Sequence, residues 1–217
     1  MKYLFTLFVF FSVIVSVYGY EKNSYTESTK SIVKEIDKIL NKNRSNNIKC
    51  NTTTLKSFAK TVIESIGNNS YKRLVDLLPT KYDFLVSIRE RLLNHDDISI
   101  SKVKRILDEF KSHPDSYDKM LLGLKENIIK SVANVSKKLK EFGLKRSDIL
   151  SSKIIDIDTK DLNIKYGGLA AWDGTLSILL KINHEYYNLR IYDVNKFNNC
   201  WRFLPQRDNG IFFNKTY

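Results

Sequence analysis

The sequence contains few of the side chains that bind metals and perform acid–base chemistry. There are two cysteines and three histidines among 217 residues. The cysteines, Cys50 and Cys200, do not form a Cys-x-x-Cys pair, so the zinc and thiol-redox motifs that depend on this spacing are excluded. The HExxH, GxSxG, P-loop and GxGxxG patterns are also absent. We therefore predict a chain with no metal, no cofactor and no enzymatic activity.

The remaining candidates for acid–base chemistry lie where solvent is expected. His95, His113 and His184 each fall in a predicted turn or helix end. Three aspartates, Asp156, Asp158 and Asp161, lie close together in the sequence. The first two alternate with isoleucines, which is typical of the solvent-exposed face of a strand. Carboxylates enclosed in a cavity would instead have pKa values that are pushed apart.

Long apolar runs are missing except at the N-terminus. Lys2 precedes a mostly apolar stretch over residues 4–15, and in residues 16–19, which follow, small or short residues stand at the positions that a signal peptidase reads. This order predicts a cleavable signal peptide over residues 1–19. The stretch is shorter than the about 20 residues that cross a bilayer. We expect a secreted or periplasmic protein without a transmembrane anchor.

The part that follows the signal peptide is long enough for one domain with a core. We divide it into an N-terminal helix with an Asn-rich linker (20–50), a single α+β domain (51–205) and a C-terminal tail (206–217).

Lysine and arginine outnumber aspartate and glutamate, and the formal net charge is +12. This excess favours anionic partners such as nucleic acid, acidic glycans or a cell surface. The positive charge is spread without a block of like charges, so a general compositional bias explains it equally well. A polyanion site would have to gather basic residues that lie apart in the sequence: Lys125, Lys137, Lys140, and Arg190 or Arg202.

Apolar residues recur at helical spacing through the first two thirds of the chain. Capping residues predict several helix starts, at Thr52–Thr54, at Ser70 and at the Thr80 and Asp83 pair. The longest helix is predicted over 116–141, with Gly143 closing it. The other predicted helices cover residues 32–40, 55–66, 71–78, 81–92 and 103–110.

From Lys153 onward, apolar residues recur at every second position, which predicts an antiparallel sheet. We expect a first strand near residues 153–158, a hairpin over 175–192 that turns at Asn183 and His184, a turn at 195–199 and a last strand at 200–203. The fold class is therefore α+β, with N-terminal helices packed on a curved C-terminal sheet of about four strands.

Two stretches carry a family resemblance: FAKTVIESIGNNSYKRLVDLLPTKYDFL (58–85) and WDGTLSILLKINHEYYNLRIYDVNKFNNCWRFL (172–204). Together they resemble small exported bacterial proteins with a fold similar to nuclear transport factor 2, the cystatin-like cone. The resemblance implies helices packed into the concave side of a bent sheet, with a pocket between them. It bounds the fold more than the function, because this superfamily includes enzymes, carriers and interaction domains.

Aromatic and polar residues share one face of the predicted hairpin. This face holds Tyr186, Asn188, Arg190 and Tyr192, and it would line a ligand cavity if it is the concave one. If the face is convex, the same residues form a solvated sheet surface. Trp172 lies in a predicted loop and would be a contact site if exposed.

Two modifications depend on export. Cys50 and Cys200 would either pair in an oxidising compartment or remain two buried thiols. Five Asn-x-Ser/Thr sequons matter only in a eukaryotic cell, and they begin at Asn43, Asn51, Asn68, Asn134 and Asn214.

Three function classes follow. The first is an exported, non-catalytic binding or interaction module with a cavity for a small apolar ligand between helices and sheet. The second is a secreted polyanion- or cell-surface-binding factor. The third is an enzyme with the cone fold, which would need a histidine and a carboxylate in one pocket.

Overall fold

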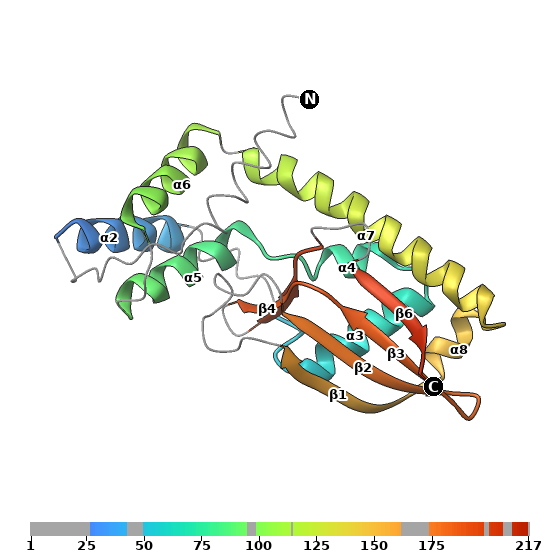
Figure 1. Ribbon diagram of the computed structural model, residues 1–217. Helices are drawn as coiled ribbons and strands as arrows, with labels where there is room; N and C mark the ends of the chain where they lie inside the picture. Colours follow the sequence, from blue (N-terminus) through green and yellow to red (C-terminus); the bar gives the residue numbers. More distant parts are fainter. Residues whose placement is uncertain are drawn as a thin grey trace.

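The computed structural model describes residues 27–42, 50–94, 99–113, 115–161, 174–197, 200–205 and 210–216 (Figure 1). The predicted signal peptide, His95 and Trp172 lie outside the described residues. Helices fill the N-terminal part, and a four-stranded antiparallel sheet forms the C-terminal part with a second sheet of two strands. The predicted α+β class is confirmed.

Seven helices lie in the described part of the chain. They are α2 (Glu27–Lys42), α3 (Leu55–Gly67), α4 (Tyr71–Val75), α5 (Lys81–Leu93), α6 (Ile100–Ser112), α7 (Ser116–Glu141) and α8 (Arg146–Leu150). All six predicted helices are present, and α7 has the predicted bounds. The short α8 was not predicted, and α4 ends before the expected stop at Pro79.

Most of the predicted helix boundaries have the expected chemistry. The hydroxyl of Thr54 accepts a hydrogen bond from the Ser57 N–H, and the hydroxyl of Thr80 accepts one from the Asp83 N–H. Each completes a capping box. Gly143 follows α7 with φ of +68°, a conformation that favours glycine. Ser70 precedes α4 without a side-chain cap, so that predicted cap is wrong.

The main sheet has the order β1 (Lys153–Asp161), β2 (Thr175–Ile182), β3 (Glu185–Ile191) and β6 (Ile211–Lys215). The predicted β2–β3 hairpin is confirmed, because Ile182 pairs with Glu185 across the turn. A separate ribbon pairs β4 (Val194–Phe197) with β5 (Cys200–Phe203).

The sequence-based interpretation is wrong at three places in this region. Cys200–Phe203 forms β5 of the separate ribbon and is not the last strand of the main sheet. Val194–Phe197 forms β4, although much of it was assigned to a turn. Ile211–Lys215 forms β6, although it was assigned to a tail. The reason for β6 is burial, because Ile211 and Phe213 are buried opposite Ile191 and Leu189 of β3.

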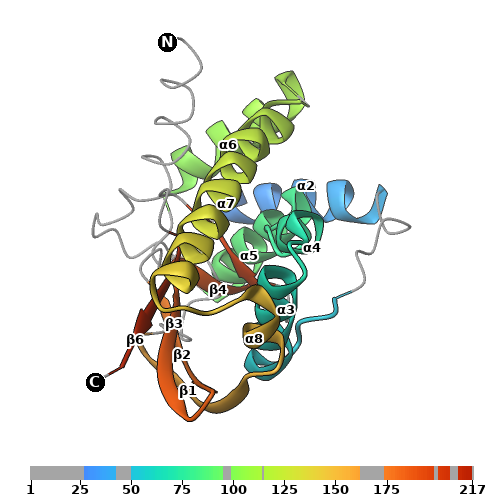
Figure 2. The same cartoon turned by 90° about the vertical axis from the view of Figure 1, so that its right-hand side faces the viewer.

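Helices α3 and α7 cover one face of the main sheet, and none of the described helices lies on the other face, which is called the helix-free face below (Figures 1 and 2). Tyr187 and Phe213 stack on the covered face with ring centroids 5.2 Å apart, and Phe142 at the end of α7 lies within 6.1 Å of Phe213. The core lies on the side of Leu189 and Ile191, because both are fully buried.

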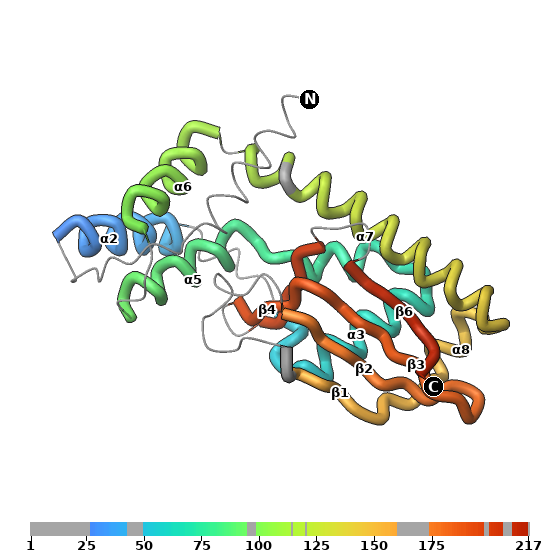
Figure 3. The backbone as a smooth tube through the Cα atoms, in the orientation of Figure 1, coloured from blue at the N-terminus to red at the C-terminus, as the bar shows by residue number. Residues whose placement is uncertain are grey.

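A second group of helices, α2, α5 and α6, lies at one end of the molecule, and α7 runs from this group along the sheet (Figure 3). In the described part of the chain, no helix is long and apolar enough to cross a membrane.

Candidate functional site: a groove beside the disulfide

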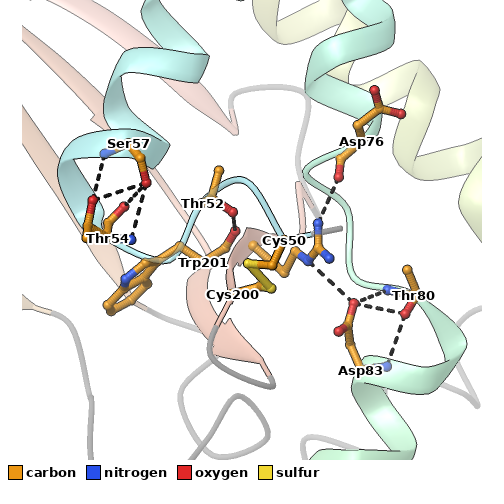
Figure 4. The surroundings of a disulfide bond; sticks show 10 residues. Cys50, Thr52, Thr54, Ser57, Asp76, Thr80, Asp83, Cys200 and Trp201 are labelled. Atoms are coloured by element: carbon orange, nitrogen blue, oxygen red, sulfur yellow. Dashed lines mark hydrogen bonds and ion pairs between the residues drawn. A yellow bond between two sulfur atoms is a disulfide. The ribbon is translucent and has the colours of Figure 1, made fainter. Parts of the chain in front are cut away.

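Cys50 and Cys200 form a disulfide, with an S–S distance of 2.05 Å and a Cα–Cα distance of 5.8 Å (Figure 4). Of the two alternatives for these cysteines, pairing is the one present. Thr52 adds two hydrogen bonds to the same strand: its hydroxyl donates to the Trp201 carbonyl at 2.9 Å, and its carbonyl accepts from the Trp201 N–H at 2.9 Å. The segment that leads into α3 is therefore held against β5.

Arg202, two residues after Cys200, extends from β5 toward the start of α5. Its side chain is buried, with Nε 3.4 Å from Asp83 Oδ2 and Nη1 donating to the Asp76 carbonyl at 2.9 Å. The same Asp83 oxygen accepts from the N–H and the hydroxyl of Thr80, at 2.7 and 2.9 Å. One carboxylate therefore caps α5 and also balances a buried guanidinium (Figure 4).

Tyr117, near the start of α7, fixes the other end of the segment between α4 and α5. Its hydroxyl donates to the Pro79 carbonyl, and its ring meets those of Phe84 and Phe110 edge-on. Burial raises the pKa of Tyr117 well above 10.0, and the nearby Asp83 carboxylate acts in the same direction. The hydroxyl is therefore a protonated hydrogen-bond donor at neutral pH.

A groove with a volume of about 960 Å³ opens over this segment. Its walls come from α3, the α4–α5 segment, the first turns of α7, and Arg202 of β5. Apolar lining is supplied by Leu77, Leu78, Pro79 and Leu121, and Tyr82 adds an aromatic ring.

Charged residues also line the groove. Arg73 and Glu64 pair with each other at 3.3 Å. Lys81 places its Nζ 4.9 Å from the centre of the Phe110 ring, a cation–π contact. Among the described residues, neither Asp76 nor Asp118 forms a salt bridge. When the Arg73–Glu64 and Arg202–Asp83 pairs are set aside, two carboxylates and one ammonium remain.

Among the ligand-binding residues proposed from the sequence, the four on the β2–β3 hairpin and just after it do not line this groove: Tyr186, Asn188, Arg190 and Tyr192. Tyr186, Asn188 and Arg190 alternate with the buried residues of β3, and they lie on the helix-free face of the sheet. Tyr186 and Arg190 are exposed, whereas Asn188 and Tyr192 are half-buried. None of the described helices covers this face, and the role of these residues in ligand binding stays a prediction.

The predicted surroundings of two histidines are confirmed. His113 follows α6 and is exposed, with Nδ1 3.5 Å from Glu109 Oε1. His184 is exposed in the β2–β3 turn with φ of +70°. Asp156 is exposed and Asp158 half-buried on β1, while the side chain of Asp161 is outside the described part. Among the described residues, no group of three His, Cys, Asp or Glu side chains is arranged to hold a metal.

The basic residues considered for a polyanion site do not gather. Arg202 is buried in its pair with Asp83, so it is not available for a basic surface cluster. Lys137 and Lys140 are exposed on α7, and Lys125 is half-buried there. Arg190 is exposed and alternates with the buried Leu189 and Ile191 of β3, so it lies on the face of the sheet opposite the one that α7 covers.

Sequence reasoning missed the groove because its parts come from distant segments. It recognised the Thr80 and Asp83 cap, which is one of the contacts that support the groove, but it gave no sign that the same carboxylate also faces Arg202. No family model, no curated protein and no solved structure matches this chain.

Proposed function

We propose that this chain is an exported, non-catalytic binding module whose ligand occupies the groove beside the disulfide. The observation that carries the proposal is the groove itself. Its volume of about 960 Å³ falls within the range of small-ligand sites, and it combines apolar lining with a few charged groups.

The walls of the groove are held in place before any ligand arrives. The disulfide holds the segment before α3, the Arg202–Asp83 pair holds the start of α5, and the Tyr117 hydroxyl holds Pro79. A preformed site loses less conformational entropy on binding than a site that must be ordered by its ligand. This arrangement supports recognition of one defined ligand shape.

The charges favour a particular ligand chemistry. After the two ion pairs are set aside, Asp76 and Asp118 outnumber Lys81. We infer a ligand with an apolar body and a cationic group, an ammonium or guanidinium, near these carboxylates. The inference runs against the overall charge of +12, because local charges dominate at contact distance whereas distant charges are screened by salt.

A binding role is favoured over catalysis by the groups present. The described histidines lie outside the groove, and burial keeps the Tyr117 hydroxyl protonated. Export is supported by the predicted signal peptide together with a disulfide, which persists in oxidising compartments. The resemblance to the nuclear transport factor 2 fold stays a hypothesis, supported by helices that pack on an antiparallel sheet.

Native mass spectrometry of the protein purified gently from its exporting cell tests the proposal. We expect the wild type to retain a bound mass and Val75→Trp to lose it, because Val75 lines the groove and an indole there would fill it. Val86→Trp is the matched control, since Val86 is also half-buried but does not line the groove. A wild type without bound mass, or equal retention by Val75→Trp, would contradict the proposal.

A further inference from the structure

We propose that this chain is an N-glycoprotein with glycans on Asn51, Asn68, Asn134 and Asn214. The inference rests on the export included in the proposed function. It places that export in a eukaryotic secretory pathway, where Asn-x-Ser/Thr is the acceptor sequence, in place of the bacterial source that the family resemblance implies. Each of the four begins such a sequence. The fifth sequon, at Asn43, lies outside the described residues.

The four acceptor asparagines differ in exposure from the asparagines that lie in the interior of the fold. All four acceptors are exposed. The described asparagines with a buried or half-buried position are Asn127, Asn188 and Asn195, and none of them begins a sequon. Asn127, for example, donates from Nδ2 to the Pro205 carbonyl at 2.7 Å. A glycan on such an amide would break a native contact, and the sequence places no sequon there.

Three of the acceptor side chains, those of Asn51, Asn68 and Asn214, can carry a glycan without loss of a hydrogen bond. Asn51 lies in the segment after Cys50, and Asn68 caps the end of α3 through its backbone N–H. In the described part of the chain, the side chains of Asn51, Asn68 and Asn214 make no hydrogen bond. Asn134 lies on the solvent side of α7, between turns that bury Val132 and Val135. A glycan attached to Nδ2 of Asn68, Asn134 or Asn214 would extend into solvent, whereas a glycan on Asn51 would start at the wall of the groove, which Asn51 lines.

The hydroxyls of the sequons pose no conflict with the fold. Ser136 belongs to the Asn134 sequon, and in the folded chain its Oγ donates to the Val132 carbonyl and accepts from Arg146. The glycan is bonded to the asparagine and not to the serine. The hydroxyl is therefore available for these hydrogen bonds once the chain has folded.

Asn214 gives the modification a structural consequence. It lies on β6, the edge strand of the main sheet, and is paired with Asn188 beside the exposed Phe212. Exposed edge strands with apolar side chains promote association between molecules. A bulky, hydrated glycan at Asn214 would cover this edge and the adjoining helix-free face. The glycan therefore protects β6 from strand addition.

The test is peptide mass spectrometry of the processed protein purified from its own exporting cell. Treatment with peptide-N-glycosidase in heavy-oxygen water converts each glycosylated asparagine to labelled aspartate. We expect this label at all four acceptors and none at Asn94 or Asn183, which are exposed but begin no sequon. The proposal is overturned for every acceptor whose peptide keeps an unlabelled asparagine. The label is read from peptides without any ligand, so a failed ligand assay leaves the result unaffected, also at Asn51, which lines the groove.

A pair of variants tests the role at Asn214. Thr216→Ala removes the sequon and keeps Asn214, whereas Thr216→Ser keeps the sequon. We expect Thr216→Ala to lose the label at Asn214 and to aggregate faster than Thr216→Ser. Equal aggregation of the two variants would overturn the protective role, and a label that persists in Thr216→Ala would overturn attachment through the sequon.

Discussion

At the scale of single residues, Asp83 has two roles that depend on its charge. It caps α5 through Thr80, and it is the carboxylate that faces the buried guanidinium of Arg202. We predict that Asp83→Ala lowers the free energy of unfolding by about 3–5 kcal/mol, because it leaves a buried charge without its partner. Urea denaturation followed by circular dichroism measures the change.

A double variant in which both Asp83 and Arg202 are replaced by uncharged residues serves as the control for Asp83→Ala. The double variant Asp83→Asn with Arg202→Met removes both charges and keeps an acceptor for the Thr80 cap. We expect it to be more stable than Asp83→Ala, since replacing both partners of a buried pair costs much less than removing one. If the double variant is no more stable than Asp83→Ala, the unpaired guanidinium is not the cause.

Tyr117 makes stability depend on pH at the alkaline end. Its folded-state pKa lies well above 10.0, so above about pH 10 the unfolded chain releases this proton first. The stability that Tyr117 contributes is complete below that pH and falls as pH rises further. We predict that Tyr117→Phe costs about 1 kcal/mol at neutral pH, through the lost hydrogen bond to Pro79.

The measurement for Tyr117 is a comparison of the two proteins across pH. The difference in unfolding free energy between wild type and Tyr117→Phe should shrink from about pH 9 to about pH 11. Other alkaline titrations, such as those of the lysines, affect both proteins alike. A difference that stays constant over this range would show that Tyr117 does not titrate as described.

At the scale of elements, the sequence pattern predicted the helices and caps that are stabilised by interactions within their own segment. The bounds of α7 follow from its apolar periodicity and from Gly143, and the capping boxes of α3 and α5 follow from their own residues. The short elements α8, β4 and β6 were missed. Their few residues carry little periodicity, and they are ordered by contacts with distant segments: β6 by β3, and α8 by α3.

The candidate site was harder to predict than the fold for the same reason. Alternation in β3 correctly separated Tyr186 and Arg190 from the core, but it did not show that none of the described helices covers their face. The groove depends on where the segment between α4 and α5 meets β5. That meeting is set by the disulfide and by the contacts of Arg202, which no local pattern encodes.

Gly210 tests how tightly β6 is packed, and Gly123 in α7 serves as the comparison. A Cβ on Gly210, just before β6, would lie 2.8 Å from Pro205 Cβ and 3.2 Å from its Cα. We predict that Gly210→Ala lowers stability by about 1–3 kcal/mol through overpacking. Gly123 in α7 has no atom within 4 Å of such a Cβ, so Gly123→Ala should raise stability by about 0.5–1 kcal/mol. Thermal unfolding of both variants checks the opposite signs, and equal shifts would refute the packing argument.

At the scale of the whole molecule, two kinds of link hold the N-terminal helices to the sheet. One is packing, since α3 and α7 cover the sheet face that carries Tyr187 and Phe213. The other is the strip of contacts along β5, where the disulfide, Thr52 and Arg202 join three separate segments. Reducing the disulfide leaves the hydrogen bonds of Thr52 and Arg202 in place, so the reduced chain is expected to stay folded in the absence of denaturant.

The disulfide should nevertheless be a large single contribution to stability. It joins residues 150 positions apart, and in the chain-entropy model closing a loop of that length stabilises the folded state by about 5 kcal/mol. We predict that Cys50→Ala with Cys200→Ala lowers the midpoint of guanidinium unfolding strongly, and that reductant lowers the wild-type midpoint by a similar amount. Reductant should leave the double variant unchanged, because the described chain has no free cysteine. A wild-type midpoint that does not respond to reductant would show that the two sulfurs are not bonded in solution.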